Sequence, residues 1–454
     1  MSQAYNNGDL VKFNGAKFIY HDSFYGLNSL HGLPNIPFEE FVEKTFQLGG
    51  LTVNYKGFAD AKNFVYPYLF ENSANLANMC HSCGHIGIAE GLGKAIQELQ
   101  LPPWQIALSS GIGCGGKLSS QYKAVLPENY AASIPNEGAV AAILKDAGVS
   151  LTTVTYLEQL LNLNRYHVIH GHATSHAFGL AMTQPGLVNI VAGGDGDLGA
   201  IGLPYLKRLI QNNVNTLVIP MVNEVYGLTK GQPSPSTAKG LKGRAMPDAM
   251  DIMPIDFVLE TLAIPESTYV ARVIANNRKA MKEHFISGIM HNGTAIVDVL
   301  SPCVTWNTEH DGKYYELYAV DVNNFNWDDV QTQLKELGEE IERFQTAKSI
   351  QEGKVQDSKR LKLEVETRKY NLFHDLLQEE RIEQYDPTNK DLAFKVERRL
   401  VEAGFCAIGL IYYNKDSVSY QDRKGLLPAS PIGNLTTEQL TLSLDNLLSL
   451  EDIM

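Results

Sequence analysis

The sequence predicts an α/β fold with a mostly parallel sheet and flanking helices. Between Cys80 and Thr305, apolar runs of strand length alternate with helical segments, which is the pattern of parallel strands joined by crossover helices. The clearest unit has a strand at 187–191, a helix at 204–210 and a strand at 216–219. With 454 residues, 44% of them apolar, the chain is also long enough to bury a sizeable core.

Composition divides the chain into four segments. We expect an N-terminal extension over 1–70, a core domain over 71–308 with an insertion at about 119–165, a charged helical insertion over 309–404, and a C-terminal strand and tail over 405–454. In the first segment, a proline opens a short helix expected at 37–42.

The segment after 309 is expected to be helical because its apolar residues recur at helix spacing. Val330, Leu334, Leu337, Ile341 and Phe344 follow one another at intervals of 4, 3, 4 and 3, which places them on one stripe. A two-helix hairpin would bury such a stripe. The apolar run that follows, at 405–413, predicts a buried strand.

Charge and cysteine content exclude several classes of protein. The 51 acidic and 38 basic residues leave a net charge of −13, which disfavours a nucleic-acid partner. Five cysteines are too few for a secreted disulfide framework, so we expect a reducing, cytoplasmic location. The chain has no leader-like start and no apolar run of about 18 residues, so no association with a membrane is expected.

Four cysteines form a pattern that suits a metal centre. Cys80 and Cys83 form a C-x-x-C pair, Cys114 lies in a glycine-rich segment, and Cys303 follows a proline. Glycines let backbone N–H groups approach a bulky inorganic group. A single four-thiolate iron–sulfur cluster fits this spacing, and a structural zinc ion on the same cysteines or on His85 fits it equally well.

Acidic residues between two expected strands predict a diphosphate and magnesium site. The segment Gly193-Gly194-Asp195-Gly196-Asp197 follows the first strand, and Asn223 follows the second, 28 positions after Asp195. These residues would meet at the carboxyl ends of neighbouring parallel strands, where open α/β sheets bind ligands. The Asp195 carboxylate, the Asn223 amide oxygen and the Val225 carbonyl are apt magnesium ligands, and thiamine diphosphate is the favoured partner of the ion.

Six motifs together are similar to those of one family. They are Cys80-x-x-Cys83-Gly84-His85, Ser110-Gly111-Ile112-Gly113-Cys114, His170-Gly171, Gly194-Asp195-Gly196-Asp197, Tyr226-Gly227-Leu228-Thr229-Lys230-Gly231-Gln232 and Ser301-Pro302-Cys303. In this combination the chain resembles the beta subunit of 2-oxoacid:ferredoxin oxidoreductases, especially the 2-oxoglutarate branch. The match covers roughly 75–125, 165–306 and 405–425.

The resemblance implies a thiamine-diphosphate-binding fold with the following ligands. Cys80, Cys83, Cys114 and Cys303 would hold one 4Fe-4S cluster, which favours iron–sulfur over zinc, while Asp195, Asn223 and the Val225 carbonyl would hold Mg²⁺. Further cofactor contacts are expected from His85, Gly194, Gly196, Asp197, Gly227, Leu228 and Thr229. His170 would contact the diphosphate or the substrate, and Lys117 could pair with the distal carboxylate of a dicarboxylic 2-oxo acid.

The implied activity is coenzyme A-dependent oxidative decarboxylation of 2-oxoglutarate to succinyl-CoA and CO₂. Electrons would pass through the cluster to ferredoxin, and the reverse reaction would fix CO₂, as in a reductive TCA cycle. The chain would be active only with an alpha subunit, as αβ or (αβ)₂. Three alternatives remain: the same chemistry on pyruvate or branched-chain 2-oxo acids, a cluster-free thiamine enzyme, and a non-enzymatic zinc-stabilised scaffold subunit.

Overall fold

The computed structural model describes residues 79–99, 106–120, 164–184, 187–343 and 350–425, together with four short N-terminal strands. These four strands form two antiparallel pairs, β1 (Leu10–Phe13) with β2 (Ala16–Ile19) and β3 (Thr45–Leu48) with β4 (Leu51–Asn54). The helix expected at 37–42 and most of the insertion expected at 119–165 lie outside the described residues. None of the described helices combines the length and the apolar character needed to cross a bilayer.

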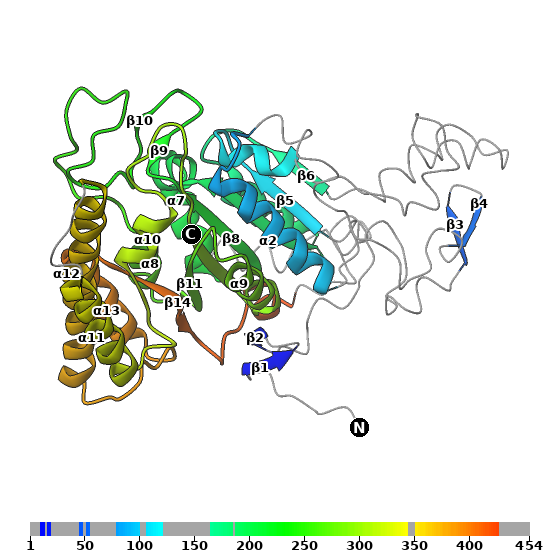
Figure 1. The fold of residues 1–454 in the computed structure, drawn as a ribbon. Coiled ribbons are helices and arrows are strands. Elements are labelled where there is room, and N and C mark those ends of the chain that lie inside the picture. The colour runs from blue at the N-terminus through cyan, green and yellow to red at the C-terminus, as the bar shows by residue number, and fades with distance from the viewer. Residues whose placement is uncertain are drawn as a thin grey trace, which may run out of the picture.

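An eight-stranded sheet organises the molecule (Figure 1). Its order is β13-β14-β11-β12-β8-β7-β5-β6. In chain order the strands are β5 (Ile106–Ser110), β6 (Asn164–His167), β7 (Val188–Gly194), β8 (Thr216–Val222), β11 (Tyr269–Ile274), β12 (Thr294–Leu300), β13 (Ala319–Asp321) and β14 (Cys406–Tyr413). Two further strands, β9 (Val225–Tyr226) and β10 (Gln232–Pro233), form a separate antiparallel pair.

The sheet is mostly parallel, as the sequence predicts. All pairings from β11 to β6 are parallel, whereas β14 runs antiparallel to β11 and carries β13 parallel to itself. The expected strand at 405–413 is therefore present, but it is only partly buried: Ile408, Gly409 and Leu410 are half-exposed. Its position next to the short edge strand β13 explains this exposure.

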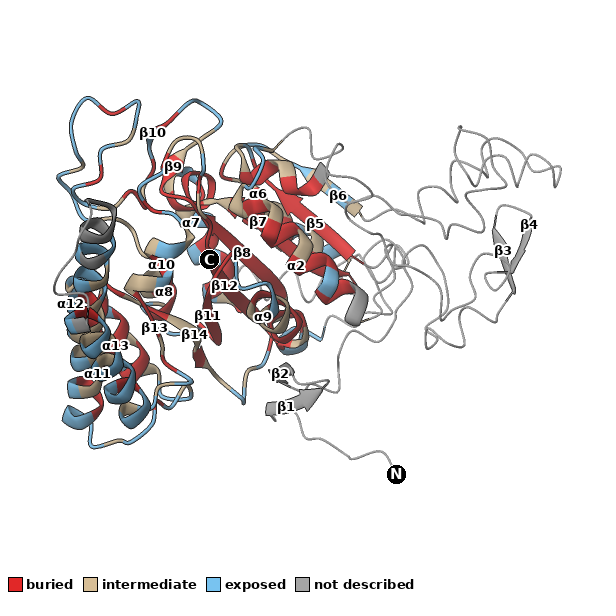
Figure 2. Cartoon of the chain, in the orientation of Figure 1, coloured by how far each residue is buried: buried red, intermediate tan, exposed pale blue. Residues whose placement is uncertain are grey.

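Helices cover both faces of the sheet (Figures 1 and 2). The helices are α2 (Gly84–Glu98), α6 (Ala173–Thr183), α7 (Leu203–Asn212), α8 (Phe257–Leu262), α9 (Arg278–Met290), α10 (Gly312–Tyr318), α11 (Trp327–Arg343), α12 (Ile350–Glu379), α13 (Lys390–Glu402) and α14 (Tyr420–Arg423). Short 3₁₀ and π turns, η3 (Gly115–Ser120) and η4 (Asp197–Ile201), follow β5 and β7.

Two apolar cores arise because successive strand residues point to opposite faces. Ile190 and Leu217 pack with α2 and α9 on one face, whereas Val191 and Val218 pack with α6 and α7 on the other. The register pairs Ile190 with Leu217 and Val191 with Val218, so each core receives matched residues from neighbouring strands. The expected strand–helix–strand unit at 187–219 is thereby confirmed, as β7, α7 and β8.

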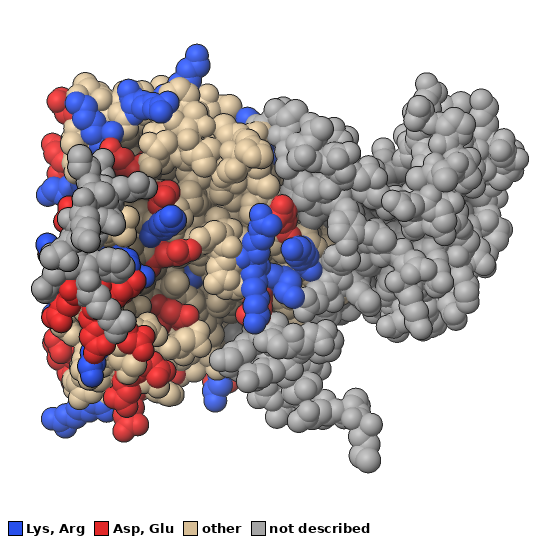
Figure 3. Space-filling model, in the orientation of Figure 1, with Lys and Arg blue, Asp and Glu red and all other residues tan. Residues whose placement is uncertain are grey.

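The charged C-terminal segment packs against the β11–β14 end of the sheet. Charged side chains gather over α11, α12 and α13 (Figure 3). On α11 the expected stripe is present, with Val330 and Ile341 buried and Leu334 and Leu337 half-buried, while the side chain of Phe344 lies outside the described residues. Because β13 and β14 join the central sheet, this segment contributes strands as well as helices; the domain boundaries stay a prediction.

A buried arginine ties this segment to the sheet. Arg272 of β11 is 2% exposed and donates to Asp298 of β12 at 2.6 Å, to the helix-capping Asp256 at 2.5 Å and to Glu397 of α13. Glu397 also accepts from the Ala407 backbone of β14 at 2.9 Å. One cation therefore joins two parallel strands, the start of α8 and the C-terminal helices.

The strand order creates a ligand-binding edge. From β5 the chain moves to β6 on one side, and it then returns to β7 on the other side of β5. The loops after β5 and β7 therefore diverge, and in open α/β sheets such a point is where ligands bind, at the carboxyl ends of the strands. The predicted cysteine and aspartate motifs immediately follow these two strands.

Candidate functional site

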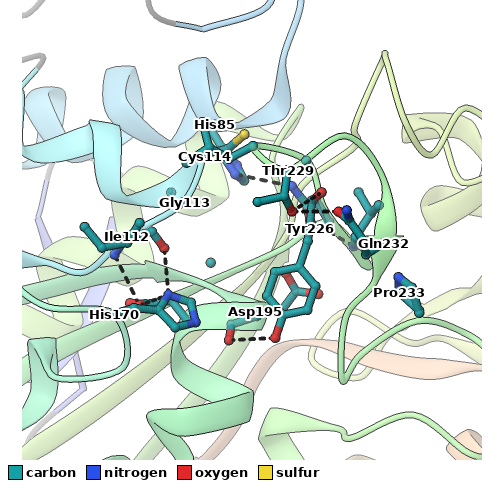
Figure 4. Close-up of a pocket in the computed structure, with 18 residues that line it drawn as sticks. His85, Ile112, Gly113, Cys114, His170, Asp195, Tyr226, Thr229, Gln232 and Pro233 are labelled. Carbon is teal, nitrogen blue, oxygen red and sulfur yellow. Dashed lines mark hydrogen bonds and ion pairs between the residues drawn. The ribbon is translucent and has the colours of Figure 1, made fainter. Parts of the chain in front are cut away.

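A cavity of about 500 Å³ opens at this carboxyl edge. Its wall is formed by the loops after β5, β6, β7 and β8, the β9–β10 pair, and one residue of α2. Figure 4 shows Cys114 and His85 at one end, His170 and Asp195 at the other, and Tyr226, Thr229 and Gln232 along a further side. The wall includes these predicted site residues: His85, Cys114, His170, Gly194, Asp195, Gly196, Asp197, Asn223, Val225, Gly227, Leu228 and Thr229.

Asp195 is a buried carboxylate held by neutral donors. Its Oδ2 accepts from the Ser234 hydroxyl at 2.5 Å and from the Glu224 backbone N–H at 3.1 Å. Burial raises the pKa of Asp195 to about 7; the Ser234 hydrogen bond opposes the rise, and the neighbouring Glu224 charge adds to it. A cation in the cavity would stabilise the ionised form of this group.

Asp197 anchors three loops at the start of the π turn. Its Oδ1 accepts from the Gly171 N–H at 2.7 Å and the Ile112 N–H at 3.3 Å, and lies 3.0 Å from Nδ1 of His170. A side chain at position 111 could not fit, because a Cβ there would lie 2.2 Å from Asp197 Oδ2. Burial raises the pKa of Asp197, and its Oδ2 is buried with no partner among the described residues.

Asn223 and Val225 lie on a tight turn directly after β8. The Asn223 Oδ1 accepts from the Val225 N–H at 3.1 Å, and its Nδ2 lies 3.5 Å from Nε2 of His85. The residue between them, Glu224, has a φ of 61°, which is uncommon for a residue with a side chain. Asn223 and Val225, on either side of Glu224, both line the cavity.

The four predicted cluster ligands share one neighbourhood. Burial raises the pKa of the Cys83 thiol to about 12; a hydrogen bond from the His85 backbone opposes the rise, and the charges of Cys303, Cys114 and Cys80 add to it. The Gly84 N–H donates to the Pro302 carbonyl at 3.1 Å, which joins the C-x-x-C turn to the third cysteine segment.

Hydrogen-bond donors also reach these thiols. The Trp306 N–H lies 3.4 Å from the Cys303 sulfur, and the Thr305 hydroxyl lies 3.3 Å from the Cys80 sulfur. Among the described residues, no three His, Cys, Asp or Glu side chains converge closely enough to hold a single metal ion. A zinc ion needs its ligands within about 2.3 Å of one point, whereas a 4Fe-4S cluster needs thiols spread around a larger body.

The cysteine group and the acidic group meet in the cavity. Cys114 is both a member of the thiol group and part of the cavity wall, and a Cβ at Gly227 would lie 3.2 Å from its sulfur. His85 links the two groups, because its Nδ1 contacts the Ser301 hydroxyl at 2.7 Å while its Nε2 faces Asn223. Burial lowers the pKa of His85 to about 4, and the Lys117 charge contributes, so His85 is neutral at physiological pH.

Lys117 does not belong to the cavity wall. It lies half-buried on the 3₁₀ turn after Cys114, and its N–H donates to the Cys114 carbonyl at 3.3 Å. Its charge still reaches the cavity end. Burial lowers the pKa of His85 and the Lys117 charge adds to this fall, whereas burial raises the pKa of the Cys114 thiol and the Lys117 charge opposes this rise. Cys80, Cys83 and Cys303 also lie outside the wall.

Several residues that support the site do not stand out in the sequence. Glu224, Ser234, His310 and Tyr315 hold the acidic loops, although none of them belongs to a recognisable pattern. Glu224 could have been noticed as an acidic residue between two expected magnesium ligands. The role of His310 depends on a contact 86 positions away, which no local signal indicates.

Similarity to known proteins decides the family. Residues 146–299 match the family described as thiamine pyrophosphate enzyme, C-terminal TPP binding domain. The chain is 34% identical to the 2-oxoacid:ferredoxin oxidoreductase subunit beta of Saccharolobus solfataricus over 270 residues, covering 58% of this chain and 74% of that protein. This chain belongs to the 2-oxoacid:ferredoxin oxidoreductase beta subunits. It is also 29% identical over 236 residues to a 2-oxoglutarate oxidoreductase subunit KorB of Mycobacterium tuberculosis, covering 52% of each chain.

A solved structure shares the fold of this beta subunit. It is described as a 2-oxoglutarate:ferredoxin oxidoreductase from Magnetococcus marinus with 2-oxoglutarate, coenzyme A and succinyl-CoA bound. The TM-score is 0.54 at 21% identity, over 86% of this chain and 96% of the other. The family, the oxidoreductase class and the thiamine-diphosphate-binding fold expected from the sequence are thereby confirmed.

Proposed function

We propose that this beta subunit catalyses coenzyme A-dependent oxidative decarboxylation of 2-oxoglutarate to succinyl-CoA and CO₂, with electrons passing through one 4Fe-4S cluster to ferredoxin. Thiamine diphosphate, Mg²⁺ and an alpha subunit complete the proposed enzyme, as αβ or (αβ)₂, and the reaction is reversible. The observation that carries the proposal is that Cys114 and Asp195 line the same cavity. A redox centre and a diphosphate site would then adjoin.

The acidic end of the cavity fits a magnesium diphosphate. Of the described lysines and arginines, none forms an ion pair with Asp195 or Asp197, although both carboxylates are at most 2% exposed. A buried carboxylate that stays ionised needs a compensating cation or strong hydrogen-bond donors. Asp195, Asn223 and the Val225 carbonyl would supply the hard oxygen ligands that Mg²⁺ prefers, while Gly194, Gly196, Asp197, Gly227, Leu228 and Thr229 would enclose the cofactor.

The residues of the chain position and shield the reacting groups. When bound, thiamine diphosphate would supply an electron sink for decarboxylation. His170, half-buried and fixed by Asp197, would contact the diphosphate or substrate. Cys80, Cys83, Cys114 and Cys303 would hold the cluster at the other end, and donors such as the Trp306 N–H would tune its potential.

An alpha subunit would cover an apolar edge of the cavity. Ile112, Ile169, Ile201 and Leu228 follow β5, β6, β7 and β9 respectively, and they are 41–73% exposed. Exposed apolar side chains gathered at one edge are typical of a surface that contacts another polypeptide. Ferredoxin would receive electrons from the thiol end, where Cys80 is exposed.

Substrate choice is the first test of the proposal. The alpha and beta subunits, purified together without oxygen, are assayed for coenzyme A-dependent reduction of a viologen dye. We expect 2-oxoglutarate to be preferred over pyruvate by at least about tenfold in kcat/KM, since one charged contact is worth about 1.5–3 kcal/mol. A preference for pyruvate or branched-chain acids would retain the chemistry and refute the substrate.

Lys117 is the proposed source of that preference. Lys117→Met should lower kcat/KM for 2-oxoglutarate while changing turnover of pyruvate little. Lys94→Met, on the exposed face of α2, is the matched control and should change neither. An equal loss on both acids would assign Lys117 a role other than recognition of the distal carboxylate.

The cysteine assignment is tested by iron content. Cys303→Ser should lose the 4Fe-4S signature and its iron. Cys406→Ser is the control, because Cys406 lies on β14 and is not among the proposed ligands. Retention of all iron by Cys303→Ser would contradict the proposed ligand set.

A further inference from the structure

Glu224 is a buried acidic side chain that the proposed reaction does not use. It is 7% exposed and lies between the two proposed magnesium ligands that follow β8. Its backbone adopts a φ of 61°, a left-handed conformation that is costly for a residue with a Cβ. Such a conformation persists only where surrounding contacts stabilise it.

The side chain of Glu224 is anchored by the segment around α10. Its Oε2 lies 2.7 Å from Nδ1 of His310, and its Oε1 accepts from the Tyr315 hydroxyl at 3.0 Å. The Ala238 N–H lies 3.4 Å from Oε2. Both carboxyl oxygens therefore have partners, and these partners come from two segments distant in sequence.

The backbone of Glu224 is fixed as firmly as its side chain. Its N–H donates to Asp195 Oδ2 at 3.1 Å, and its carbonyl accepts from the Thr237 hydroxyl at 2.7 Å. On the preceding residue, the Asn223 carbonyl accepts from the Asn307 side chain at 3.3 Å. Every polar group of Glu224 thus contributes to holding the turn.

We propose that Glu224 is a positioning residue of the magnesium site. By bonding to His310 and Tyr315, it holds the turn 223–225 in the left-handed conformation that places Asn223 and Val225 in the cavity wall with Asp195. This inference rests on the proposed function, since it assigns a role toward the ion proposed above. His310 and Tyr315, from the segment that follows the core domain, would thereby support the site through Glu224.

A stack of aromatic rings continues from His310 into that segment. The His310 and Tyr314 rings are parallel, with centroids 3.7 Å apart, and Tyr314 stacks on Tyr318 at 4.4 Å. Tyr318 in turn stacks on Phe405, next to β14, at 6.0 Å. The orientation of His310, and through it that of Glu224, is therefore set by packing that reaches the last strand of the sheet.

Metal affinity measures the positioning role directly. The complex with the alpha subunit is stripped of metal and titrated with Mn²⁺ at saturating thiamine diphosphate, and free Mn²⁺ is measured by electron paramagnetic resonance. Mn²⁺ is the probe because it shares the oxygen ligands of Mg²⁺. Glu224→Ala should raise the Kd about 10–100-fold, as loss of an outer-sphere partner does.

Two milder variants separate positioning from folding. Tyr315→Phe removes one hydrogen bond to Glu224 and should raise the Kd about 3–10-fold, and Glu224→Gln, which keeps an acceptor oxygen, should fall between Tyr315→Phe and Glu224→Ala. Tyr314→Phe is the matched control, since it keeps the stacked ring and removes a hydroxyl that makes no hydrogen bond to Glu224 within the described region. In the Glu224 and Tyr315 variants, the apparent KM for Mg²⁺ should rise while kcat recovers at saturating Mg²⁺.

The outcomes distinguish this inference from the proposed function. If wild-type complex binds Mn²⁺ and both Glu224→Gln and Tyr315→Phe bind within about twofold of it, the positioning role is refuted and the proposed function stands. If wild-type complex binds neither Mn²⁺ nor thiamine diphosphate, the proposed function fails and the inference fails with it. Unchanged iron content and circular dichroism verify that each variant is folded.

Discussion

Two clusters of buried carboxylates differ in where their compensating charge comes from. Around Arg272, three carboxylates from Asp256, Asp298 and Glu397 surround a cation of the protein itself. At the carboxyl edge, Asp195 and Asp197 are equally buried, yet no described lysine or arginine pairs with either. The first cluster lies between β11, β12, the start of α8 and α13, and the second faces a cavity.

The two clusters differ in the charges that surround their buried carboxyl groups. Burial raises the pKa of both Glu397 and Asp195 to about 7. Near Glu397 the Arg272 charge opposes this rise, whereas near Asp195 the Glu224 charge adds to it. The Arg272 cluster contains its own cation, whereas the Asp195 cluster would receive its cation from the proposed magnesium ion.

The largest expected effect comes from removing the charge at the cavity. Asp195→Asn should lower kcat/KM for the 2-oxo acid by at least about 100-fold, because the proposed magnesium loses an anionic ligand. Stability without cofactor should be unchanged or higher, since the variant removes a buried charge that Glu224 repels. The dye-reduction assay and urea denaturation measure the two effects.

Asp248→Asn is the matched control for this change. Asp248 is exposed on the loop after β10, and its variant should retain wild-type activity. Activity of Asp195→Asn within about tenfold of wild type would show that the second cluster does not bind the ion.

The opposite behaviour is expected when the protein cation is removed. Arg272→Met should destabilise the fold by about 3–5 kcal/mol, because the buried carboxylates of Asp298 and Glu397 and the partly exposed carboxylate of Asp256 lose their partner. Urea denaturation of the purified complex measures this loss. Arg278→Met, which breaks the ion pair between a 54% exposed arginine and Glu90, should cost less than about 1 kcal/mol. An equal loss of unfolding free energy in the two variants would contradict a special structural role for the buried Arg272.

Cofactor binding should stabilise the protein through the Asp195 cluster and not through the Arg272 cluster. At about 100 times its Kd, magnesium thiamine diphosphate should raise the free energy of unfolding by about 2.7 kcal/mol. Asp195→Asn should abolish this gain, while Glu397→Gln should preserve it. A gain of the same size in Asp195→Asn would place the cofactor elsewhere.

The smallest expected effect is a pH dependence of stability from the Arg272 cluster. Glu397 has a folded pKa of about 7 against 4.5 when unfolded, so the folded state binds more protons between these values and stability falls as pH rises. The stability of Glu397→Gln relative to wild type should therefore increase by about 1–3 kcal/mol from pH 4.5 to 7. A flat or falling difference in urea denaturation across this window would contradict the raised pKa.

Local patterns were sufficient to predict the core of the fold. The alternation of apolar runs and helical segments predicts β7, α7 and β8, and the stripe on Val330 and Ile341 predicts α11, because these elements depend on periodicities that neighbouring residues encode. The reversed pairing of β14 with β11 was not predictable in this way. It depends on contacts between segments about 140 residues apart, such as Tyr269 with Tyr413.

In the candidate site, too, the residues predicted from the sequence are those with a local sequence signal. Asp195 and Cys114 were predicted because each belongs to a short motif, and Asn223 because it follows the next strand of the expected sheet. The structure brings all three to one cavity. The residues that support them, such as His310, were missed, because their roles arise from tertiary contacts with Glu224. Lys117, which follows the proposed cluster ligand Cys114 by three residues, lies outside the wall.

The most direct test of the account is the composition of the complex purified without oxygen. We expect one thiamine diphosphate and one Mg²⁺ per beta chain, with iron and sulfide matching one 4Fe-4S cluster held by Cys80, Cys83, Cys114 and Cys303. Elemental analysis, sulfide determination and thiamine quantification provide these numbers. Zinc on the cysteines together with an absence of thiamine would contradict the central claim that this chain joins a diphosphate site to a redox centre.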